Sequence, residues 1–475
     1  MGSLGGKSEA PPRSMRVVTD SIHGSIEMTD DEWGVVDTPS FQRLRHLKQL
    51  QMAHLTYPNA THTRLAHSLG VFSVMSRVVH AAKDVLSLSA EDMAELRLAA
   101  LLHDVGHYPY SHLMEKIDKV QLTEEVVKSP SSEKRSLDLS SSAAPYPKHE
   151  PLGELIVTER QDLVDAIGGA SRARRVADLF TRSDAADPQK SKLIHSSLDM
   201  DRFDFLLRDA NATGVPYGNV DLHYLLSNLR ASATGMIGFS HKAMAAAEQF
   251  LFARFFMYKV VYYHKTTFGF EEACRQLLRR CRDNGLYDVP RTGEDIRNWV
   301  RGDDFLNFTD AWVDQVVRKA AKDSDPVIGG LAKSIVYRQP PALIREVHEL
   351  KDLSASGGAE HCKGFLNRCQ DRLNGLAGEL NVDPRLFMVA GPIQVKLEDR
   401  SSKLTRDTAG ELEDEEREEL VKIFEKHKSE PRSLVDIPSS ITHHAANHAF
   451  QFTRLYLVSP NKAVIHAARE KVKSW

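Results

Sequence analysis

Apolar side chains recur every three or four residues through much of this chain, which is the pattern of amphipathic helices. Two such segments come early, at residues 68–86 and 93–102. In the second segment, Met93, Leu96 and Ala99 fall on one helical face. We therefore expect two helices here, the second of them buried on that face.

The pattern over the whole chain predicts a mainly α fold with a small mixed α/β lobe at the C-terminal end. A short strand pair is expected around Gly24, within residues 16–28. Further helices are expected over residues 152–167, 171–183, 197–211, 242–282, 294–322, 341–380 and 411–428, and C-terminal strands over residues 385–397 and 452–459.

Shifts in composition divide the chain into three regions. Residues 1–14 are rich in Gly, Ser and Pro, and we expect them to be disordered. Residues 15–290 are expected to form the main helical domain, and residues 291–475 a helical and mixed C-terminal lobe. Within the main domain, the Ser-rich residues 123–148 predict a flexible insertion. This insertion is either a plain surface loop or a lid over a site, because His149 follows it directly.

Charge and hydropathy limit the classes of function. The 475 residues carry a net charge of -3, so the composition indicates neither a nucleic-acid-binding nor a membrane-surface protein. An anionic ligand would have to be held by local positive charge. No apolar run approaches the roughly 18 residues that span a bilayer, and the first residues lack the apolar core of a signal peptide. We therefore expect a cytoplasmic protein, or a nuclear one in a eukaryote.

The four cysteines fall in two pairs, Cys274 with Cys281 and Cys362 with Cys369. Within each pair the spacing separates the side chains by two turns of a straight helix, which is too far for a disulfide. We expect free thiols in a reducing compartment, with a bridge between the two pairs as the alternative.

The candidate chemistry centres on the adjacent His103 and Asp104, which directly follow the apolar segment at residues 93–102. An isolated His67 lies upstream, and Asp201 lies far downstream. Imidazole nitrogens and carboxylate oxygens are ligands for divalent metals, so these four residues make a complete ligand set for one ion. Such an ion can activate water for attack on phosphorus, which indicates a hydrolase.

Two interpretations of the segment after His103 stay open. If the helix continues, His107 lies on the same face as His103, one turn later. Alternatively, Gly106 and Pro109 end the helix, and the polar side chains are simply helix-end residues.

Several motifs occur in the same order as in a known family. They are DSIHGSI at residues 20–26, FQRLRHLKQL at 41–50, HTRLAHSLG at 62–70, HDVGHYPYSH at 103–112, DRFD at 201–204 and YYHK at 262–265. Together they cover roughly residues 16–290 and resemble the HD-domain deoxynucleotide triphosphohydrolases. The resemblance is greatest to the SAM-and-HD-domain branch, without a SAM domain in these residues. It implies an HD-domain helical fold and a metal-dependent phosphohydrolase.

By this resemblance, the metal ligands are His67, His103, Asp104 and Asp201. The set holds nitrogen and oxygen but no sulfur. It therefore suits Mn, Fe, Co, Ni or Zn, and Mg more weakly.

The implied reaction cleaves a deoxynucleoside triphosphate to deoxynucleoside and tripolyphosphate, with metal-activated water attacking the α-phosphorus. His112 would donate a proton to the leaving group or position it, supported by Glu115 and His149. Glu115 stands where the family has Asp. Arg64 and His107 would neutralise phosphate charge.

The resemblance also implies contacts with the substrate. Gln49 and Asp209 match residues that bind the sugar 3′-hydroxyl. Tyr262 matches an aromatic residue near the base, and Arg254 matches an Arg that contacts phosphate.

Three substrate positions depart from the family pattern. Arg202 stands in place of a phosphate-binding Lys, so the charge is kept but the geometry is not. Phe205 stands in place of a Tyr that packs beneath the sugar, and Tyr258 in place of a His. These departures bear on the substrate more than on the reaction class.

Regulation and assembly are further implications of the resemblance. Asp37, Gln42 and Arg45 match positions that bind an activating guanine nucleotide at a subunit interface, and Lys265 matches an interface phosphate contact. The alternative is that this segment only helps to build the fold. A homo-oligomer, dimer or tetramer, is implied as well.

Two other functions stay open. The chain is alternatively an HD-family phosphohydrolase or phosphodiesterase that acts on another nucleotide or on single-stranded nucleic acid, as the changes at Arg202, Phe205 and Tyr258 favour. A third hypothesis is a non-enzymatic nucleotide sensor or scaffold, against which the complete ligand set argues.

Overall fold

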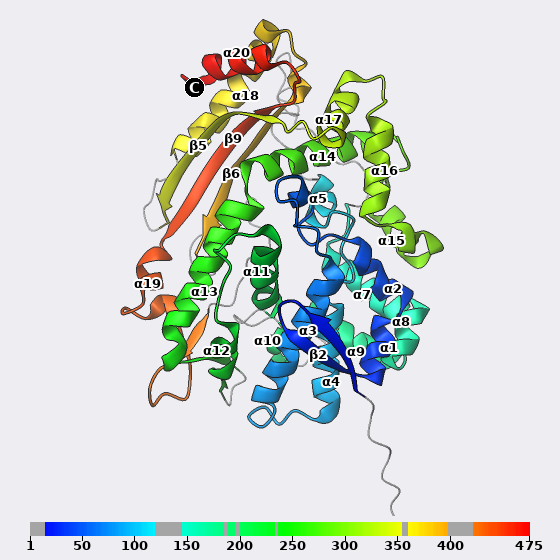
Figure 1. The fold of residues 1–475 in the computed structure, drawn as a ribbon, viewed down its shortest axis with the longest axis vertical. Coiled ribbons are helices and arrows are strands. Elements are labelled where there is room, and N and C mark those ends of the chain that lie inside the picture. The colour runs from blue at the N-terminus through cyan, green and yellow to red at the C-terminus, as the bar shows by residue number, and fades with distance from the viewer. Residues whose placement is uncertain are drawn as a thin grey trace, which may run out of the picture.

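The computed structural model describes residues 15–118, 145–181, 183, 186, 188–194, 200–232, 236–353, 360–397 and 421–475. Most of these residues are helical, and a small sheet with its own helices lies at one end of the molecule (Figure 1). The predicted fold class, mainly α with a small mixed α/β lobe, is confirmed. The predicted disordered N-terminus and residues 119–144, which hold most of the predicted insertion, lie outside the described residues.

A two-stranded antiparallel hairpin opens the described chain, as predicted. Its strands are β1 (Met15–Asp20) and β2 (Gly24–Thr29), and Gly24 has a positive φ of 73° where the second strand begins. Such a backbone conformation favours glycine. Four short helices follow, α1 (Asp30–Val36), α2 (Pro39–Gln42), η1 (Arg43–His46) and η2 (Ala53–Leu55).

Three helices carry the predicted metal ligands or adjoin them: α3 (Arg64–Ala82), α4 (Ala90–Leu102) and α11 (Met200–Thr213). Helix α3 starts earlier than the apolar pattern indicated, because the Thr63 side chain caps its first turn. Helix α4 starts at a capping box formed by Ser89 and Asp92. The apolar faces of all three helices lie in one large hydrophobic core.

The segment predicted as one helix over residues 152–167 is two helices, α7 (His149–Glu159) and α8 (Gln161–Ile167). Between them Arg160 has an extended backbone, and its guanidinium donates hydrogen bonds to the carbonyls of Val300 and Gly302. A distant contact therefore accompanies the break. The neighbouring elements are α5 (His112–Glu115), η3 (Lys116–Asp118), α9 (Ala170–Thr181), α10 (Pro188–Ile194) and α12 (Leu222–Ser227).

The long apolar segment predicted over residues 242–282 is also interrupted. It forms η4 (His241–Ala243), α13 (Met244–Met257), the π-helical turn η5 (Tyr258–Tyr262) and α14 (Lys265–Asp283). In Figure 1, α13 and α14 run between the sheet of the C-terminal lobe and the other helices. Helices α15 (Gly293–Arg301), α16 (Asp310–Ala320) and α17 (Pro326–Val336), with η6 (Asp303–Asn307), share the large core. The predicted domain boundary near residue 290 stays a prediction.

The C-terminal lobe is an antiparallel sheet of order β5–β9–β6, with strands β5 (Ala342–Asp352), β9 (His448–Leu457) and β6 (Phe387–Lys396). Helices α18 (Glu360–Leu380) and α20 (Lys462–Val472) pack on it around a second, smaller core. The two predicted C-terminal strands correspond to β6 and β9. The predicted helix over residues 341–380 is wrong in its first third, because β5 pairs with β9 along its whole length and this pairing overrides local helix propensity.

A four-stranded sheet of order β3–β4–β7–β8 joins two distant parts of the chain. Its strands are β3 (Leu229–Ala231), β4 (Ile237–Ser240), β7 (Lys422–Phe424) and β8 (Arg432–Ser433). The predicted helix over residues 411–428 is therefore wrong in its described part, since residues 422–424 pair with β4 and β8. The remaining short elements are η7 (Pro384–Leu386), η10 (Leu434–Asp436) and α19 (Ile441–Ala445).

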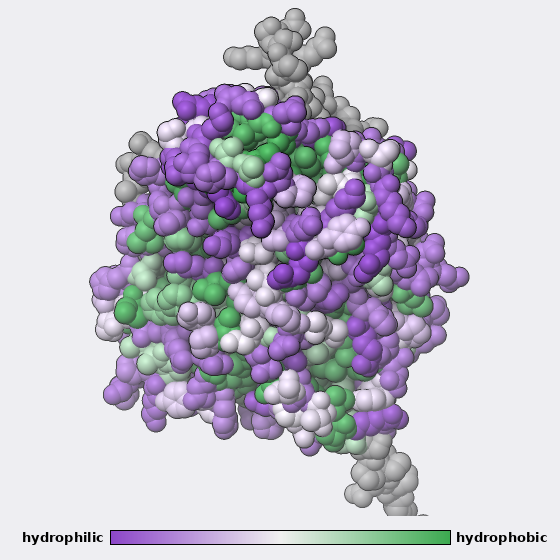
Figure 2. Space-filling view, turned by 45° about the horizontal axis from the view of Figure 1, so that its top comes forward, coloured by the Kyte–Doolittle hydropathy of each residue, from purple (hydrophilic) through white to green (hydrophobic). Residues whose placement is uncertain are grey.

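All four cysteines are buried and carry free thiols, as predicted. On the face drawn in Figure 2, hydrophilic side chains cover much of the surface and small hydrophobic groups lie between them. Within the described residues, no helix combines the length and the apolar character that crossing a bilayer requires.

Candidate metal centre and active site

The four predicted ligands come from the ends of three helices. His67 lies in the first turn of α3, and His103 directly follows the last residue of α4. Asp104 comes next in the turn after α4, and Asp201 lies in the first turn of α11. The core that packs these helices together therefore brings the ligands to one place.

The donor atoms of His67, His103 and Asp201 lie close enough together to hold a single metal ion, and the carboxylate of Asp104 lies beside them. His67 Nε2 lies 2.7 Å from Asp201 Oδ1 and 3.6 Å from Asp104 Oδ2. His103 Nε2 lies 3.3 Å from Asp104 Oδ1 and 3.9 Å from Asp201 Oδ1. An ion with bonds of about 2.1 Å holds neighbouring donors roughly 3.0–3.4 Å apart. His103 Nε2 is also buried with no hydrogen-bond partner among the described residues, as expected of an atom reserved for a metal.

The charge around His67 favours a cation. Burial alone would lower the pKa of His67, but hydrogen bonds and charge from Asp201 and Asp204 outweigh burial and raise it to about 10. Burial would raise the pKa of Asp104, and the nearby Arg64 and His103 instead hold it well below its usual range. These carboxylates are therefore ionised, and a divalent ion is a natural partner for this concentration of negative charge. The residues present can therefore hold a divalent metal ion.

Helix α4 does not continue to His107, since it ends at Leu102. The backbone turns, with Val105 N donating to Leu102 O and His107 N donating to Asp104 O. His107 Nε2 lies 3.1 Å from Asp104 Oδ1, so His107 and His103 both face the same carboxylate from different directions. The end of α4 and the candidate metal site therefore lie at the same place in the chain.

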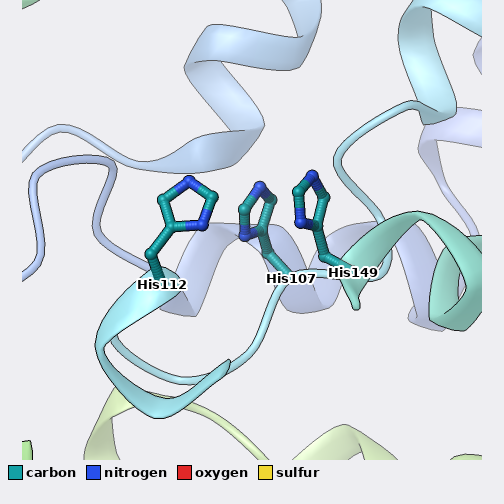
Figure 3. Close-up of side chains that lie close together, drawn as sticks. All are labelled: His107, His112 and His149. Carbon is teal, nitrogen blue, oxygen red and sulfur yellow. The ribbon is translucent and has the colours of Figure 1, made fainter. Parts of the chain in front are cut away.

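A second group of side chains lies beside the predicted ligands. Figure 3 shows the imidazoles of His112, His107 and His149 in a row, the first and last from the starts of α5 and α7 and the middle one from the turn after α4. The rings of His107 and His149 are stacked 4.1 Å apart. One nitrogen from each of the three rings lies within 4.8 Å of the others, so this group could also hold a positively charged metal ion.

Glu115 joins two of these histidines. Its Oε2 lies 2.8 Å from His112 Nδ1, and its Oε1 lies 3.2 Å from His149 Nδ1 and accepts the backbone N–H of His149. Burial would raise the pKa of Glu115, but these hydrogen bonds from His112 and His149 hold it far below its usual range. The carboxylate is therefore ionised at neutral pH, and the longer Glu side chain spans both histidines.

Arg64 connects the two groups. Its Nη1 donates to Asp104 Oδ2 at 2.5 Å and its Nε donates to Ser111 Oγ at 2.7 Å. Ser111 and Tyr110 both have φ near +50°, which is a strained conformation for residues other than glycine. Asp310 on α16 accepts the Tyr110 N–H at 2.8 Å, so a helix from a distant segment stabilises the loop that presents His112.

The residues predicted to bind the sugar and base also lie together. Asp209 Oδ1 lies 2.7 Å from His62 Nε2, and its Oδ2 accepts the Tyr262 hydroxyl at 2.8 Å. Tyr262 packs edge-on against Phe205 and Tyr258. Tyr258 and Tyr262 are the ends of η5, and π-helical turns are frequent at functional sites.

Other predicted residues are placed less directly. Gln49 Oε1 is buried and has no hydrogen-bond partner among the described residues. Arg202 is half-buried and follows Asp201 on α11. Arg254 is buried, lies over the Tyr258 ring and donates to Leu397 O.

The predicted regulatory residues fall at the surface. Arg45 donates to Gln42 Oε1 at 2.8 Å, and Gln42 donates to Val36 O at 2.7 Å. Asp37 is an exposed residue at the end of α1, and Lys265 is an exposed residue at the start of α14. Binding of a nucleotide there stays a prediction.

Sequence reasoning gave no role to four residues that contact the site: His23, His62, Ser111 and Asp204. All four lie inside the motifs at residues 20–26, 62–70, 103–112 and 201–204, so motif membership was the available signal. His62, Ser111 and Asp204 each contact a predicted site residue at 2.7 Å, namely Asp209, Arg64 and His67 in that order. His23 contacts Asp204 at the same distance.

Replacing Gly106 with Ala is expected to displace the start of α7 and with it His149. A Cβ at residue 106 would lie 2.0 Å from His149 O and 2.4 Å from Gly153 N, so backbone must move. We expect a loss of about 1–3 kcal/mol in the free energy of unfolding, together with reduced turnover. Thermal unfolding and phosphohydrolase assays check this. The control is Gly34→Ala in α1, where no described atom lies within 4 Å of the added Cβ; equal losses in both variants would contradict the prediction.

Comparisons with known proteins point to one family. The family model of the HD domain matches residues 64–167, and the model of the HD associated region matches residues 220–304. The first match contains the ligand candidates His67, His103 and Asp104, and Asp201 lies between the two matches.

Individual relatives agree. The uncharacterized protein YwfO of Bacillus subtilis is 28% identical over 424 residues, which are 85% of this chain and 83% of YwfO. Human SAMHD1, a deoxynucleoside triphosphate triphosphohydrolase, is 41% identical over 105 residues, 22% of this chain and 17% of SAMHD1. The chain spans about half the length of several other relatives.

The fold is shared with a solved structure, that of a phosphohydrolase from Bacteroides thetaiotaomicron. The TM-score is 0.67 at 20% identity, and the match covers 93% of this chain and 100% of the other. The matched HD domain and HD associated region, with the partial match to SAMHD1, place the chain among the HD-domain phosphohydrolases.

Proposed function

We propose that this phosphohydrolase cleaves deoxynucleoside triphosphates to deoxynucleoside and tripolyphosphate. The observation that carries the proposal is that two groups of side chains lie next to each other. The first is the set of four ligand candidates that includes His67, and the second is the pair of histidines bridged by Glu115. The match to SAMHD1, which has this activity, covers the segment that contributes most of both groups.

The proposed metal ligands are His67, His103, Asp104 and Asp201. A divalent ion held by them would activate water and stabilise negative charge on the phosphate. The side chains of the protein do the rest.

In the proposed reaction, water adds to the α-phosphorus and the bond from this phosphorus to the sugar 5′ oxygen breaks. His112 gives its proton to that oxygen, and Glu115 keeps the imidazole oriented through Nδ1 so that Nε2 faces the substrate. Arg64 and His107 lie beside Asp104, where they neutralise the phosphate chain. The triphosphate ester and one water molecule are thus converted to the deoxynucleoside and tripolyphosphate.

The nucleoside is proposed to bind between α11 and η5. Asp209 and Gln49 would bind the sugar 3′-hydroxyl, and the ring of Tyr262 would lie near the base. Phe205 has no hydroxyl to exclude a 2′-hydroxyl, so ribonucleotides belong in the test. This residue also favours the second candidate, hydrolysis of another nucleotide or of single-stranded nucleic acid.

The proposal is tested by anion-exchange chromatography of the products from each dNTP and NTP, incubated with Mn²⁺ or Mg²⁺, alone and in mixtures. We expect deoxynucleoside and intact tripolyphosphate. Mixtures show at the same time whether one nucleotide activates hydrolysis of another. Orthophosphate release, or cleavage of an oligonucleotide at similar rates, would support the second candidate and overturn the first.

A further inference from the structure

His67 is oriented by a buried carboxylate that is not among the ligand candidates. Its Nδ1 lies 2.7 Å from Asp204 Oδ2, and both side chains are fully buried. An ionised carboxylate only accepts hydrogen bonds, so the ring proton resides on Nδ1. The other ring nitrogen, Nε2, therefore faces Asp104 and Asp201, where it can bind a metal once it gives up its own proton.

Asp204 is in turn oriented from two sides. Arg208, one turn later on α11, donates from Nε to Oδ2 and from Nη2 to Oδ1, both at 2.8 Å. His23 Nε2 lies 2.7 Å from Asp204 Oδ1, and the His23 side chain is 1% exposed. Every oxygen of the carboxylate therefore has two partners, and the group cannot rotate without losing several charged hydrogen bonds.

The chain of contacts continues into the β1–β2 hairpin. Arg208 donates from Nη1 and Nη2 to Asp20, and Asp20 Oδ2 accepts the backbone N–H groups of Ile22 and His23. The turn that presents His23 is thus closed by the same Asp that binds Arg208. In Figure 1 the hairpin crosses in front of α3, the helix that bears His67, and its strand β2 packs on that helix.

Helix α3 leaves space for this network at one residue. A Cβ at Gly70 would lie 1.8 Å from Asp204 Oδ1 and 2.6 Å from Arg208 Nη2. Gly70 has an ordinary helical backbone, so the need for glycine there comes from the close approach of the carboxylate. The space lies three residues after His67, on the side of the helix where the ring contacts Asp204.

We propose that Asp204 is a positioning residue for the metal and that His23 acts through it, so that metal retention depends on the β1–β2 hairpin. This inference rests on the proposed metal site. A carboxylate behind a ligand histidine fixes the tautomer and ring orientation and makes the ligand nitrogen more basic, and losing such a partner typically costs about 10–100-fold in metal affinity.

The test measures affinity for Mn²⁺ and for Zn²⁺ on the full, metal-free chain, with thermal unfolding of the same samples. Asp204→Asn is nearly isosteric and is expected to weaken binding by about 10–100-fold. His23→Ala leaves the His67–Asp204 contact in place and is expected to weaken binding by roughly tenfold, the lower end of that range. The matched control is Glu95→Gln, which removes another buried carboxylate paired with an arginine, Arg175.

The measured affinity for metal shows whether Asp204 and His23 position the metal ligand or only stabilise the fold. The control is expected to lower the unfolding temperature while its metal affinity stays within about twofold of wild type. If folded Asp204→Asn binds both metals as tightly as wild type, the inference is wrong. If Asp204→Asn does not fold, His23→Ala decides in the same way. If the wild-type chain binds neither metal, the proposed metal site itself fails, which is a distinct result from equal binding by wild type and variants.

Discussion

Replacing Asp104 with Ala is expected to lower kcat/KM for nucleotide hydrolysis by about 10³-fold or more, because the loss of Lewis-acid assistance costs several kcal/mol. Asp104 is the residue on which the two groups of the site converge. Its Oδ1 faces His103 and His107, and its Oδ2 faces His67 and Arg64. The variant therefore loses a proposed metal ligand together with the partner of Arg64, the arginine proposed to bind phosphate.

The measurement is initial-rate hydrolysis with saturating divalent metal, together with the metal content of the purified protein. Glu95→Ala is the control, since it removes a buried carboxylate from α4, the helix that precedes Asp104, and this carboxylate pairs with Arg175 rather than with a residue of the site. If Asp104→Ala keeps full activity, both the assignment of Asp104 as a metal ligand and the proposed enzymatic function are wrong. The sensor or scaffold hypothesis would then remain.

Replacing Glu115 with Gln is expected to lower kcat by about 10²-fold or more with little change in metal affinity, because it disables the proposed proton donor rather than the metal. Glu115 is ionised and bridges His112 and His149. A neutral amide presents a single acceptor oxygen in place of two, so one of the two imidazoles loses its partner. The proton on His112 then has no fixed direction.

Single-turnover rates and Mn²⁺ affinity of the same variant separate these effects. Glu154→Gln on α7 is the control, because its partner Arg174 lies at the surface and outside the site. If Glu115→Gln loses metal but keeps kcat at saturating metal, Glu115 supports the metal and not the proton transfer. The shorter carboxylate of Glu115→Asp should recover part of the rate.

Much of the fold was predictable because local patterns were strong. The hairpin, α4 and α11 were predicted close to their observed bounds, because apolar periodicity is a local signal, whereas α3 was predicted four residues too late at both ends. The first third of the predicted helix at residues 341–380 was wrong, since only pairing with β9 makes that segment a strand. The break at Arg160 likewise depends on carbonyls some 140 residues away.

The site divides in the same way. The residue types at 67, 103, 104 and 201 predicted a metal ligand set before any distance was known. Their separations could not be read from the sequence, because they depend on how α3, α4 and α11 pack. The same holds for the reach of Glu115 to both histidines, and for Asp310, which stabilises the loop before His112 from another part of the chain.

The sequence by itself determined that the chain is mainly helical and which residues can bind a metal, because side-chain chemistry and helical periodicity are local properties. Only the tertiary structure decided which nitrogen of His67 faces the ligands and which residues hold it there. That orientation depends on Asp204 and His23, which lie 137 and 44 residues from His67 along the chain and meet it only in the buried core. Within this core, a charged hydrogen bond forms only where packing places both partners, so its geometry belongs to the folded state alone.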